Sequence, residues 1–262
     1  VCAGGQAYER NARCVEAQLS TGAPVSADAN DFVVMTAGAF TAAHLALAPR
    51  IEALVGREVV TATTSVGLGD TSIESRLRKG ERAELVIVSS VMLDSFVSEG
   101  LVKAGTATLV AESTLGLAVR IGACAPDISS VEAFKRTLLA ADSVAYSASV
   151  SGKYLTTELY QRLGIEDEML PKSVFAGAGV RSGAICARGD AQIAVQQISE
   201  LLPVEGIDHI TALPDALQRR TKIAAGIGHR AVDEDSARRV LAFLASNNAR
   251  TAIEASGLTS IR

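Results

Sequence analysis

The chain has 262 residues, of which 48% are hydrophobic and 21% charged, and its formal net charge is −4. This composition is typical of a globular protein and is sufficient for two lobes of about 100 residues each. The negative charge excludes a basic surface for nucleic acid, and no run approaches the ~18 apolar residues of a membrane-spanning helix. We therefore expect neither nucleic acid binding nor membrane insertion.

The first 31 residues are predicted to form a leader and linker outside the main fold. A short helix is expected around Tyr8 to Leu19, and a stretch rich in Gly, Pro, Ser and Asn follows it. The N-terminus lacks the basic start and apolar core of a signal peptide. However, the first residue is Val1 and not Met, which is compatible with a leader that was removed. The location is expected to be periplasmic if a leader was removed, and cytoplasmic otherwise.

Short apolar runs alternate with segments of helical period through the rest of the chain, which is typical of parallel βαβ units. Strands are predicted at residues 31–35, 58–63, 84–89, 115–120, 143–146, 172–175, 191–197, 207–213 and 221–228, and a last helix at 236–246. The order of segments predicts a first lobe of residues 32–114 plus 221–262 and a second lobe of residues 115–220.

The stretch Val144 to Gly164 is the one around which we expect the rest to be organised. A strand runs into Ser147, Ser149, Ser151 and Gly152, and a helix follows with its apolar residues on one face. The first turn of a helix has unpaired N–H groups at the positive end of its dipole, so such a turn is a natural seat for an anion. The alternative is that Ser151 is simply an N-cap in a solvated loop.

Four strand-to-helix turns, at residues 36–41, 64–72, 147–152 and 176–182, are rich in Gly, Ala, Ser and Thr. In an open α/β sheet, ligands bind beyond the carboxyl ends of the strands, where these turns lie. The glycine-rich segments GLGDTS and GAGVRSG match neither the dinucleotide fingerprint nor a Walker motif. A small anion is therefore expected in place of a nucleotide.

The scattered cysteines and histidines indicate no metal site and no catalytic triad. Cys2, Cys14, Cys124 and Cys186 lack the spacing of metal ligands, although Cys2 and Cys14 could pair if the protein is exported. Cys186 is expected to be a small buried hydrophobe. No cofactor is predicted.

From Val33 onward the chain resembles the molybdate-binding proteins of ABC transporters and, more widely, the periplasmic-binding-protein fold. The resemblance is carried by VVMTAGAFTAA, SRLRKGERAELVIVSS, ISSVEAFK, SASVSGKYLTTELYQRLGI and GVRSGAICARGDAQIAV. It implies a two-lobed α/β fold of type II, in which each lobe is a mostly parallel sheet flanked by helices and the ligand binds in a cleft between the lobes.

The same resemblance implies which residues hold the ligand. Ser151 and Val180 match positions that donate backbone N–H groups, and Thr71 or Ser72 matches a serine of the molybdate site. Ala39 stands in place of a first serine and Gln197 in place of a tyrosine, which disfavours molybdate.

This sequence lacks the side chains that hold the tetrahedral ion in molybdate-binding proteins, but it has arginine and amide side chains in the same segments. Because the guanidinium fork matches a carboxylate, a small di- or tricarboxylate fits better than an oxometalate. Arg181 has the alternative of being a charge on a helix surface. The further substrate-binding candidates are Thr36, Thr41, Ser65, Ser147, Ser149, Gly152, Lys153, Arg181 and Gln196.

The segments YSASVSGKYL and QQISELLPVEGID also resemble those of bacterial aconitate isomerases. That resemblance implies a cofactor-independent allylic proton shift between trans- and cis-aconitate, which needs a base. Glu200, Asp70 and Tyr146 are the candidates, although Glu200 could be a solvated loop residue and Asp70 a turn former. The alternative function is a solute receptor that delivers an organic anion to an ABC permease.

Overall fold

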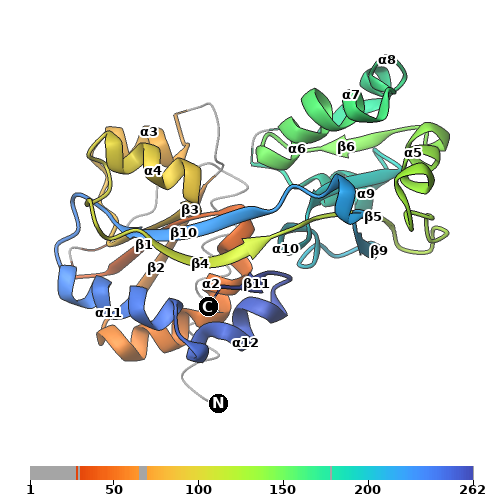
Figure 1. Cartoon of the computed structure of the whole chain (residues 1–262). Coiled ribbons are helices and arrows are strands. Elements are labelled where there is room, and N and C mark those ends of the chain that lie inside the picture. Colours follow the sequence, from red (N-terminus) through yellow and green to blue (C-terminus); the bar gives the residue numbers. More distant parts are fainter. Residues whose placement is uncertain (1–27, 29, 65–69, 178, 262) are drawn as a thin grey trace. The chain divides into compact units, whose positions relative to one another are not determined.

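The computed structural model describes residues 28, 30–64, 70–177 and 179–261, which divide into two compact units (Figure 1). The first unit comprises the described residues up to Glu112 and those from Thr221 onward, and the second comprises Ser113–Arg220. The predicted leader helix and Ser65 lie outside the described residues.

The first unit is built on a six-stranded mixed sheet with the strand order β11-β4-β10-β3-β1-β2. Its strands are β1 (Phe32–Ala37), β2 (Val59–Thr64), β3 (Leu85–Ser89), β4 (Thr108–Ser113), β10 (Thr221–Ile227) and β11 (Thr259–Ser260). β1 pairs in parallel with β2 and β3, whereas β10 is antiparallel to β3 and β11 to β4. The three parallel strands therefore end at the same edge of this sheet.

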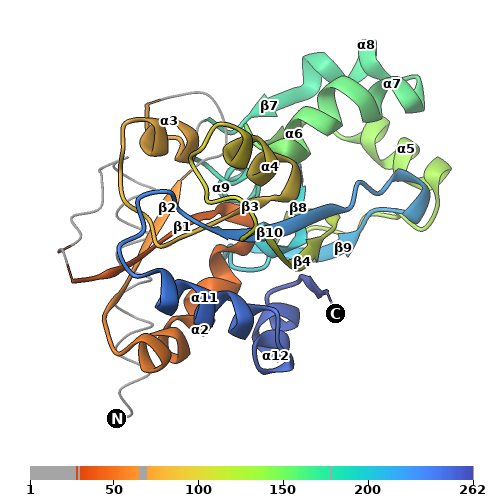
Figure 2. The ribbon, with the colours of Figure 1, turned by 60° about the vertical axis from the view of Figure 1, so that its left-hand side comes forward.

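Helices cover both faces of the first sheet: α2, α11 and α12 lie on one face, and α3 and α4 on the other (Figures 1 and 2). These helices are α2 (Gly38–Val55), α3 (Ile73–Arg78), α4 (Ser90–Ser98), α11 (Glu234–Leu244) and α12 (Asn247–Ala255). Phe32 and Val34 pack under α2, whereas Val33 and Met35 pack under α3 and α4. Successive strand residues point to opposite faces, so a strand buried on both faces is apolar throughout.

The second unit has a five-stranded mixed sheet with the order β7-β6-β8-β5-β9. Its strands are β5 (Leu115–Arg120), β6 (Val144–Tyr146), β7 (Ser173–Phe175), β8 (Ile193–Gln197) and β9 (Ile207–Ala212). β6 is parallel to β7 and β8, and β5 is antiparallel to β8 and β9. This sheet also contains three parallel strands.

The helices of the second unit are α5 (Val131–Ala140), α6 (Val150–Tyr154), α7 (Tyr160–Leu163), α8 (Glu166–Met169), α9 (Ser182–Arg188) and α10 (Ile198–Leu201). A π-helical turn, Leu155–Leu159, joins α6 to α7, and single 3-10 turns lie at Leu170–Lys172 and Asp215–Leu217. α5, α6 and α7 pack on one face of the sheet, and Cys186 of α9 on the other. Cys186 is buried, as the sequence predicts.

The predicted α/β fold with helices around each sheet is confirmed, and every predicted strand that lies in the described residues is found within two residues of its expected ends. The sheets are more mixed than the mostly parallel sheets expected, because β5, β9, β10 and β11 run antiparallel to their neighbours. The predicted last helix is α11, and α12 is a second helix that starts at its own cap, Ser246. No helix in the described part of the chain has the length and apolar character to cross a bilayer.

A buried histidine lies in the core of the first unit. His44 of α2 is completely buried, and its Nε2 lies 2.9 Å from the hydroxyl of Thr61 on β2. Its Nδ1 has no hydrogen-bond partner among the described residues. Burial lowers the pKa of His44 from 6.5 to about 4, because the charged imidazolium would lose its hydration.

Acid is therefore expected to destabilise the first unit through His44. The unfolded chain takes up a proton at about pH 6.5, whereas the folded chain resists it down to about pH 4, so stability is lost as the pH falls between these values. The linkage predicts a loss of about 3 kcal/mol by pH 4. Urea unfolding of wild type and H44Q between pH 7 and 4.5 measures it: the variant should show a flatter dependence, and H229Q, at an exposed histidine, should follow the wild type. Equal slopes for H44Q and wild type would contradict the assignment.

Candidate functional site

The parallel strands β6, β7 and β8 bring three turns together at one edge of the second sheet, which we call the carboxyl edge. β6 leads through Ser147 into α6, β7 leads to α9, and β8 leads directly into α10. The predicted turns at residues 147–152 and 176–182 therefore lie at the same end of one sheet as Gln196 and Gln197. The direction of the strands alone places these turns together, and all of them belong to the second unit.

Three serine side chains form a continuous hydrogen-bonded chain at the start of α6. The Oγ atoms of Ser147 and Ser149 are 2.8 Å apart, and those of Ser149 and Ser151 are also 2.8 Å apart. The N-cap is Ser149, whose side chain makes no capping hydrogen bond. The alternative of Ser151 as an N-cap is therefore wrong. Two hydrogen bonds use only two of the three hydroxyl protons, which leaves one hydroxyl proton that is not used within the chain.

Gly152 is required by the shape of this turn. A Cβ atom at position 152 would lie 1.9 Å from the carbonyl oxygen of Ser147, a distance that no side chain can tolerate. The carbonyl of Ser147 thus turns in over the first turn of the helix. Glycine allows this close approach of the backbone, which shapes the turn that contains Ser147, Ser149 and Ser151; we call it the serine turn.

The start of α9 is tied to the end of β8 by Gln196. The Oε1 atom of Gln196 lies 2.8 Å from the backbone N–H of Ser182 and 2.9 Å from the Ser182 hydroxyl. Both side chains are buried. The sequence analysis placed Gln196 among the ligand-binding residues and did not single out Ser182, whose only signal is its place in the small-residue turn.

Glu200 and Arg181 carry opposite charges at the carboxyl edge and interact electrostatically without a direct ion pair among the described residues. Glu200 lies in α10 and is only 7% exposed, so the alternative of a solvated loop residue is wrong. Burial raises the pKa of the Glu200 carboxyl, whereas the charge of Arg181 and a hydrogen bond from Gln196 oppose that increase. Its Oε2 atom has no hydrogen-bond partner within the described residues.

Arg181 is the N-cap residue of α9 and is partly buried. Burial lowers the pKa of its guanidinium and the charge of Glu200 raises it, and the group remains a cation in either case. Within residues 28–261 as described, the side chain of Arg181 has neither an ion pair nor a hydrogen bond. A cation at the positive end of a helix is unfavourable unless an anion lies close by.

The other predicted residues of the second unit differ in exposure. Gln197 is buried, Val180 and Tyr146 are half-buried, and Lys153 is exposed. The ring of Tyr146 lies 5.5 Å from that of Phe175, so its body is part of the packing around β7.

In the first unit, the start of α2 lies at the carboxyl end of β1. Thr36 and Thr41 are buried, and each donates its hydroxyl to the carbonyl of Ala37 at 3.2 Å. Ala39 is part of the core, and the N-cap residue of α2 is Ala37, whose methyl side chain cannot cap the helix.

Asp70, Thr71 and Ser72 precede α3 and serve different roles. Ser72 accepts a hydrogen bond from the N–H of Ser75 and so caps α3, whereas Thr71 is exposed. The side chain of Asp70 is 93% exposed and lies 3.2 Å from Lys79. This geometry is that of a surface ion pair.

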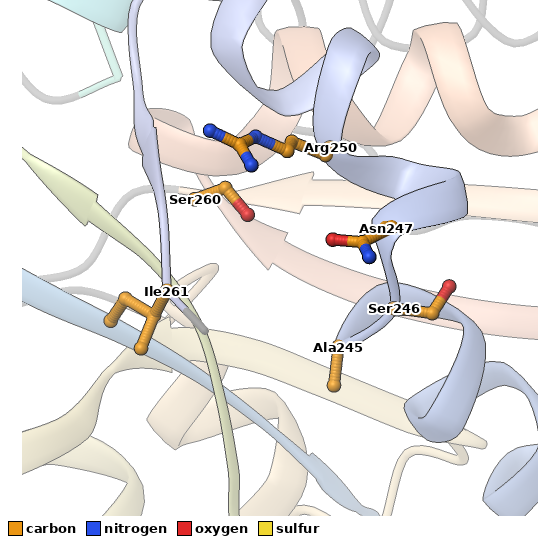
Figure 3. A pocket seen from close by; sticks show the side chains of 6 residues that line it. All are labelled: Ala245, Ser246, Asn247, Arg250, Ser260 and Ile261. Atoms are coloured by element: carbon orange, nitrogen blue, oxygen red, sulfur yellow. The ribbon is translucent and has the colours of Figure 1, made fainter.

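A pocket of about 840 Å³ lies beside the start of α12 in the first unit (Figure 3). Its lining consists of Ala245, Ser246, Asn247, Arg250, Ser260 and Ile261. Arg250 already pairs with Glu254, and none of the lining side chains is among the buried polar groups that lack a partner in the described residues. In the part of the chain that the structure describes, no three His, Cys, Asp or Glu side chains gather as metal ligands would.

Comparison with known proteins places the chain in a family. The family model described as bacterial extracellular solute-binding protein matches residues 32–259. The chain belongs to this family. An aconitate isomerase from Pseudomonas sp. is 36% identical to this chain over 229 residues, which is 87% of each chain.

Solved structures of solute-binding proteins share the fold at low identity. The periplasmic molybdate-binding protein of Azotobacter vinelandii matches with a TM-score of 0.73 and 17% identity, over 88% of this chain and 100% of that one. The sulfate-binding protein of Mycobacterium tuberculosis matches with a TM-score of 0.63 and 13% identity, over 88% and 87% of the two chains. The resemblance to the type II periplasmic binding fold is thereby confirmed.

The serine turn predicts that G152A is severely destabilising. Because the added methyl group would collide with backbone, the turn must move, at a cost of about 3 kcal/mol or more. G164A is the matched control: Gly164 ends the same helical segment with φ of 61° and open space around it, so only the backbone strain of about 1–2 kcal/mol is expected. Denaturant unfolding of both variants measures the difference. Equal losses would show that the contact with Ser147 is unimportant.

Proposed function

We propose that the protein is a cofactor-independent isomerase of a small polycarboxylate, which interconverts trans- and cis-aconitate by an allylic proton shift. The observation that carries the proposal is the buried carboxyl of Glu200, which is under the electrostatic influence of Arg181 and whose Oε2 has no hydrogen-bond partner in the described part of the chain. The 36% identity to an aconitate isomerase supports the choice of substrate.

The substrate is a trianion, so its site needs cations and N–H donors that compensate carboxylates. Arg181 supplies a planar fork that can bind one carboxylate through two hydrogen bonds. The serine turn, with its free hydroxyl proton and the first N–H groups of α6, provides a second seat. Lys153, exposed on the same helix, adds charge near that seat.

Glu200 is the base in this proposal. Its carboxylate removes a proton from the methylene carbon of aconitate, the double bond shifts by one carbon, and the same proton is returned to the former vinylic carbon. No atom is oxidised or reduced, so the reaction needs no redox cofactor. A carboxyl whose pKa is raised toward neutral is a better proton acceptor and donor than an exposed one.

Asp70 and Tyr146 fit this role less well. Asp70 is almost fully exposed to solvent and pairs with Lys79 on the surface. Tyr146 packs against Phe175. Negative charge that develops on the substrate carboxylate during proton removal would be stabilised by Arg181 and the amides of the serine turn.

A solute receptor for a small organic anion is the second candidate function, and membership of a solute-binding family favours it. Such a receptor would bind the anion through the same Arg181 and serine turn and pass it to an ABC permease. A buried carboxylate close to the bound anion would repel it and so would not help such a receptor. Incubation with trans-aconitate, followed by proton NMR in deuterated water, separates the two: turnover or solvent exchange supports the isomerase, and tight binding without either supports the receptor.

Replacement of the base is expected to abolish turnover and keep binding. E200Q preserves the shape of the side chain but cannot accept the proton, so kcat should fall by about 10²–10⁴-fold. Calorimetric titration with trans-aconitate should still give binding. E205Q, at an exposed position of the same segment, is the control and should match the wild type. Undiminished kcat in E200Q would remove Glu200 from the mechanism.

Arg181 is expected to contribute to substrate affinity. Its truncation leaves a substrate carboxylate without its cation, which costs about 2–5 kcal/mol of binding free energy if the pair is buried. The dissociation constant of trans-aconitate is best compared between E200Q and R181A/E200Q, because neither turns over. R188A/E200Q is the control, since Arg188 lies at the opposite end of α9 and pairs with Asp190 at 3.0 Å. If R181A/E200Q and R188A/E200Q bind trans-aconitate with equal affinity, Arg181 is only a surface charge.

A further inference from the structure

The start of α9 is held by a cluster of hydrogen bonds between Ser182, Val195 and Gln196, which we call the Ser182 clamp. The Oε1 atom of Gln196 accepts from the backbone N–H of Ser182 at 2.8 Å and from its hydroxyl at 2.9 Å. The same hydroxyl lies 3.2 Å from the carbonyl oxygen of Val195. Ser182 is 0% exposed and Gln196 1%, so water cannot replace these bonds when one of them is removed.

The Ser182 clamp replaces the usual helix cap. The first N–H groups of a helix have no partner within it, and a short polar side chain at the N-cap commonly accepts from one of them. In α9 the N-cap residue is Arg181, whose side chain makes no such bond among the described residues. The first N–H of α9 is satisfied by Gln196, which lies 14 residues further along the chain at the end of β8.

This arrangement allows an arginine to occupy the N-cap position. A guanidinium cannot accept a hydrogen bond, and its charge is unfavourable at the positive end of a helix unless an anion lies close by. Because Gln196 satisfies the backbone, the side chain at position 181 is not needed as a cap. The partly buried guanidinium of Arg181 has neither an ion pair nor a hydrogen bond in the part of the chain that the structure describes.

The backbone that precedes Arg181 gives its side chain little support. Gly177 and Gly179 have φ of 94° and 75°, which lie in the left-handed region that glycine adopts most readily. The backbone nitrogen of Val180 lies 3.4 Å from the carbonyl oxygen of Gly177, which is long for a hydrogen bond. The position of Arg181 therefore depends on Ser182, the residue that follows it.

We infer that Ser182 and Gln196 are positioning residues for Arg181: they anchor the first residue of α9 to the end of β8 and so hold the guanidinium where it can bind a carboxylate of the ligand. The carboxylate-binding role of Arg181 rests on the proposed function, whereas the anchoring can be tested without a ligand. The competing explanation is that the Ser182 clamp only stabilises the fold.

A double-mutant cycle separates these explanations. The probe is propane-1,2,3-tricarboxylate, the saturated analogue of aconitate, which has no double bond to shift, so calorimetry gives its Kd without turnover. S182A removes the hydroxyl and keeps the backbone N–H that bonds to Gln196. With Arg181 present, S182A is expected to raise Kd about fivefold, a loss typical of one hydrogen bond. In the R181A background the same change should leave Kd within about twofold, because the residue that the clamp positions is absent.

Q196M removes the oxygen that accepts from both groups of Ser182. It should raise Kd more than S182A does, again only when Arg181 is present, and it keeps the test decisive if S182A does not fold. An effect that is equal with and without Arg181, or no effect of either variant when Arg181 is present, would overturn the inference.

S130A is the matched control. The hydroxyl of Ser130 accepts from the N–H of Ala133 at 3.1 Å at the start of α5, so a hydroxyl that bonds to the first turn of a helix is removed elsewhere in the same unit. This variant should bind propane-1,2,3-tricarboxylate with the Kd of the wild type.

The mobility of the Arg181 side chain gives a readout without ligand. Its Nε–Hε signal is assigned from its loss in R181A, and the heteronuclear nuclear Overhauser effect of that group reports motion on the picosecond-to-nanosecond timescale. The effect should fall in S182A and Q196M and keep its wild-type value in S130A. An unchanged value in both clamp variants would overturn the inference. If the wild type neither binds the tricarboxylate nor turns over trans-aconitate, the proposed function fails, and this measurement decides whether the clamp holds Arg181.

Discussion

Burial of the Glu200 carboxyl at one edge of the second sheet, with the partly buried cation Arg181 acting on it, is the constraint on which the rest of the site depends. A carboxylate taken out of water loses hydration that only a nearby cation or a fixed donor can replace. Arg181 and Gln196 both oppose the effect of burial on the pKa of the Glu200 carboxyl. Its Oε2 atom has no hydrogen-bond partner among the described residues.

The small residues of the carboxyl edge follow from the same constraint, because the backbone must approach closely for its N–H groups to face a ligand. Gly152 admits the carbonyl of Ser147. Gly183, one residue into the start of α9, faces Leu201 and Val204, whose side chains would lie 3.3 Å from an added Cβ. α9 can therefore pack close to the segment that carries Glu200. Binding proteins for molybdate and sulfate share this fold, so the chemistry depends on the side chains placed on the edge and not on the fold.

Much of the fold could be predicted from the sequence, because strands buried on both faces are apolar without interruption. Leu85 and Ile87 face one core and Val86 and Val88 the other, so the run LVIV predicts a central strand by itself. The small-residue turns were also visible, since Ser147, Ser149 and Gly152 are adjacent in sequence. α12 was missed because its polar start, SNN, directly follows α11 and resembles the frayed end of a single helix.

The environment of individual side chains could not be predicted, because it depends on contacts distant in sequence. Glu200 and Asp70 were equal candidates for the base, yet one is buried beside Arg181 and the other extends into solvent beside Lys79. The four-residue helix α10 is too short to give a periodic pattern, so nothing local indicated that Glu200 points inward. Likewise, nothing in the sequence near Gln196 indicates that its Oε1 accepts hydrogen bonds from Ser182, 14 residues earlier.

The continuity of the chain has a consequence for the order of folding during synthesis. The second unit is one uninterrupted segment, whereas the first unit consists of two segments that are distant in sequence. In the first unit, β3 can form its antiparallel pairing with β10 only after β10 has been synthesised. The ribosome therefore releases all of Ser113–Arg220 before the sheet of the first unit can close. Until then the edge of β3 that faces β10 offers free N–H and C=O groups to other nascent chains, and only the arrival of Thr221–Ile227 removes that hazard.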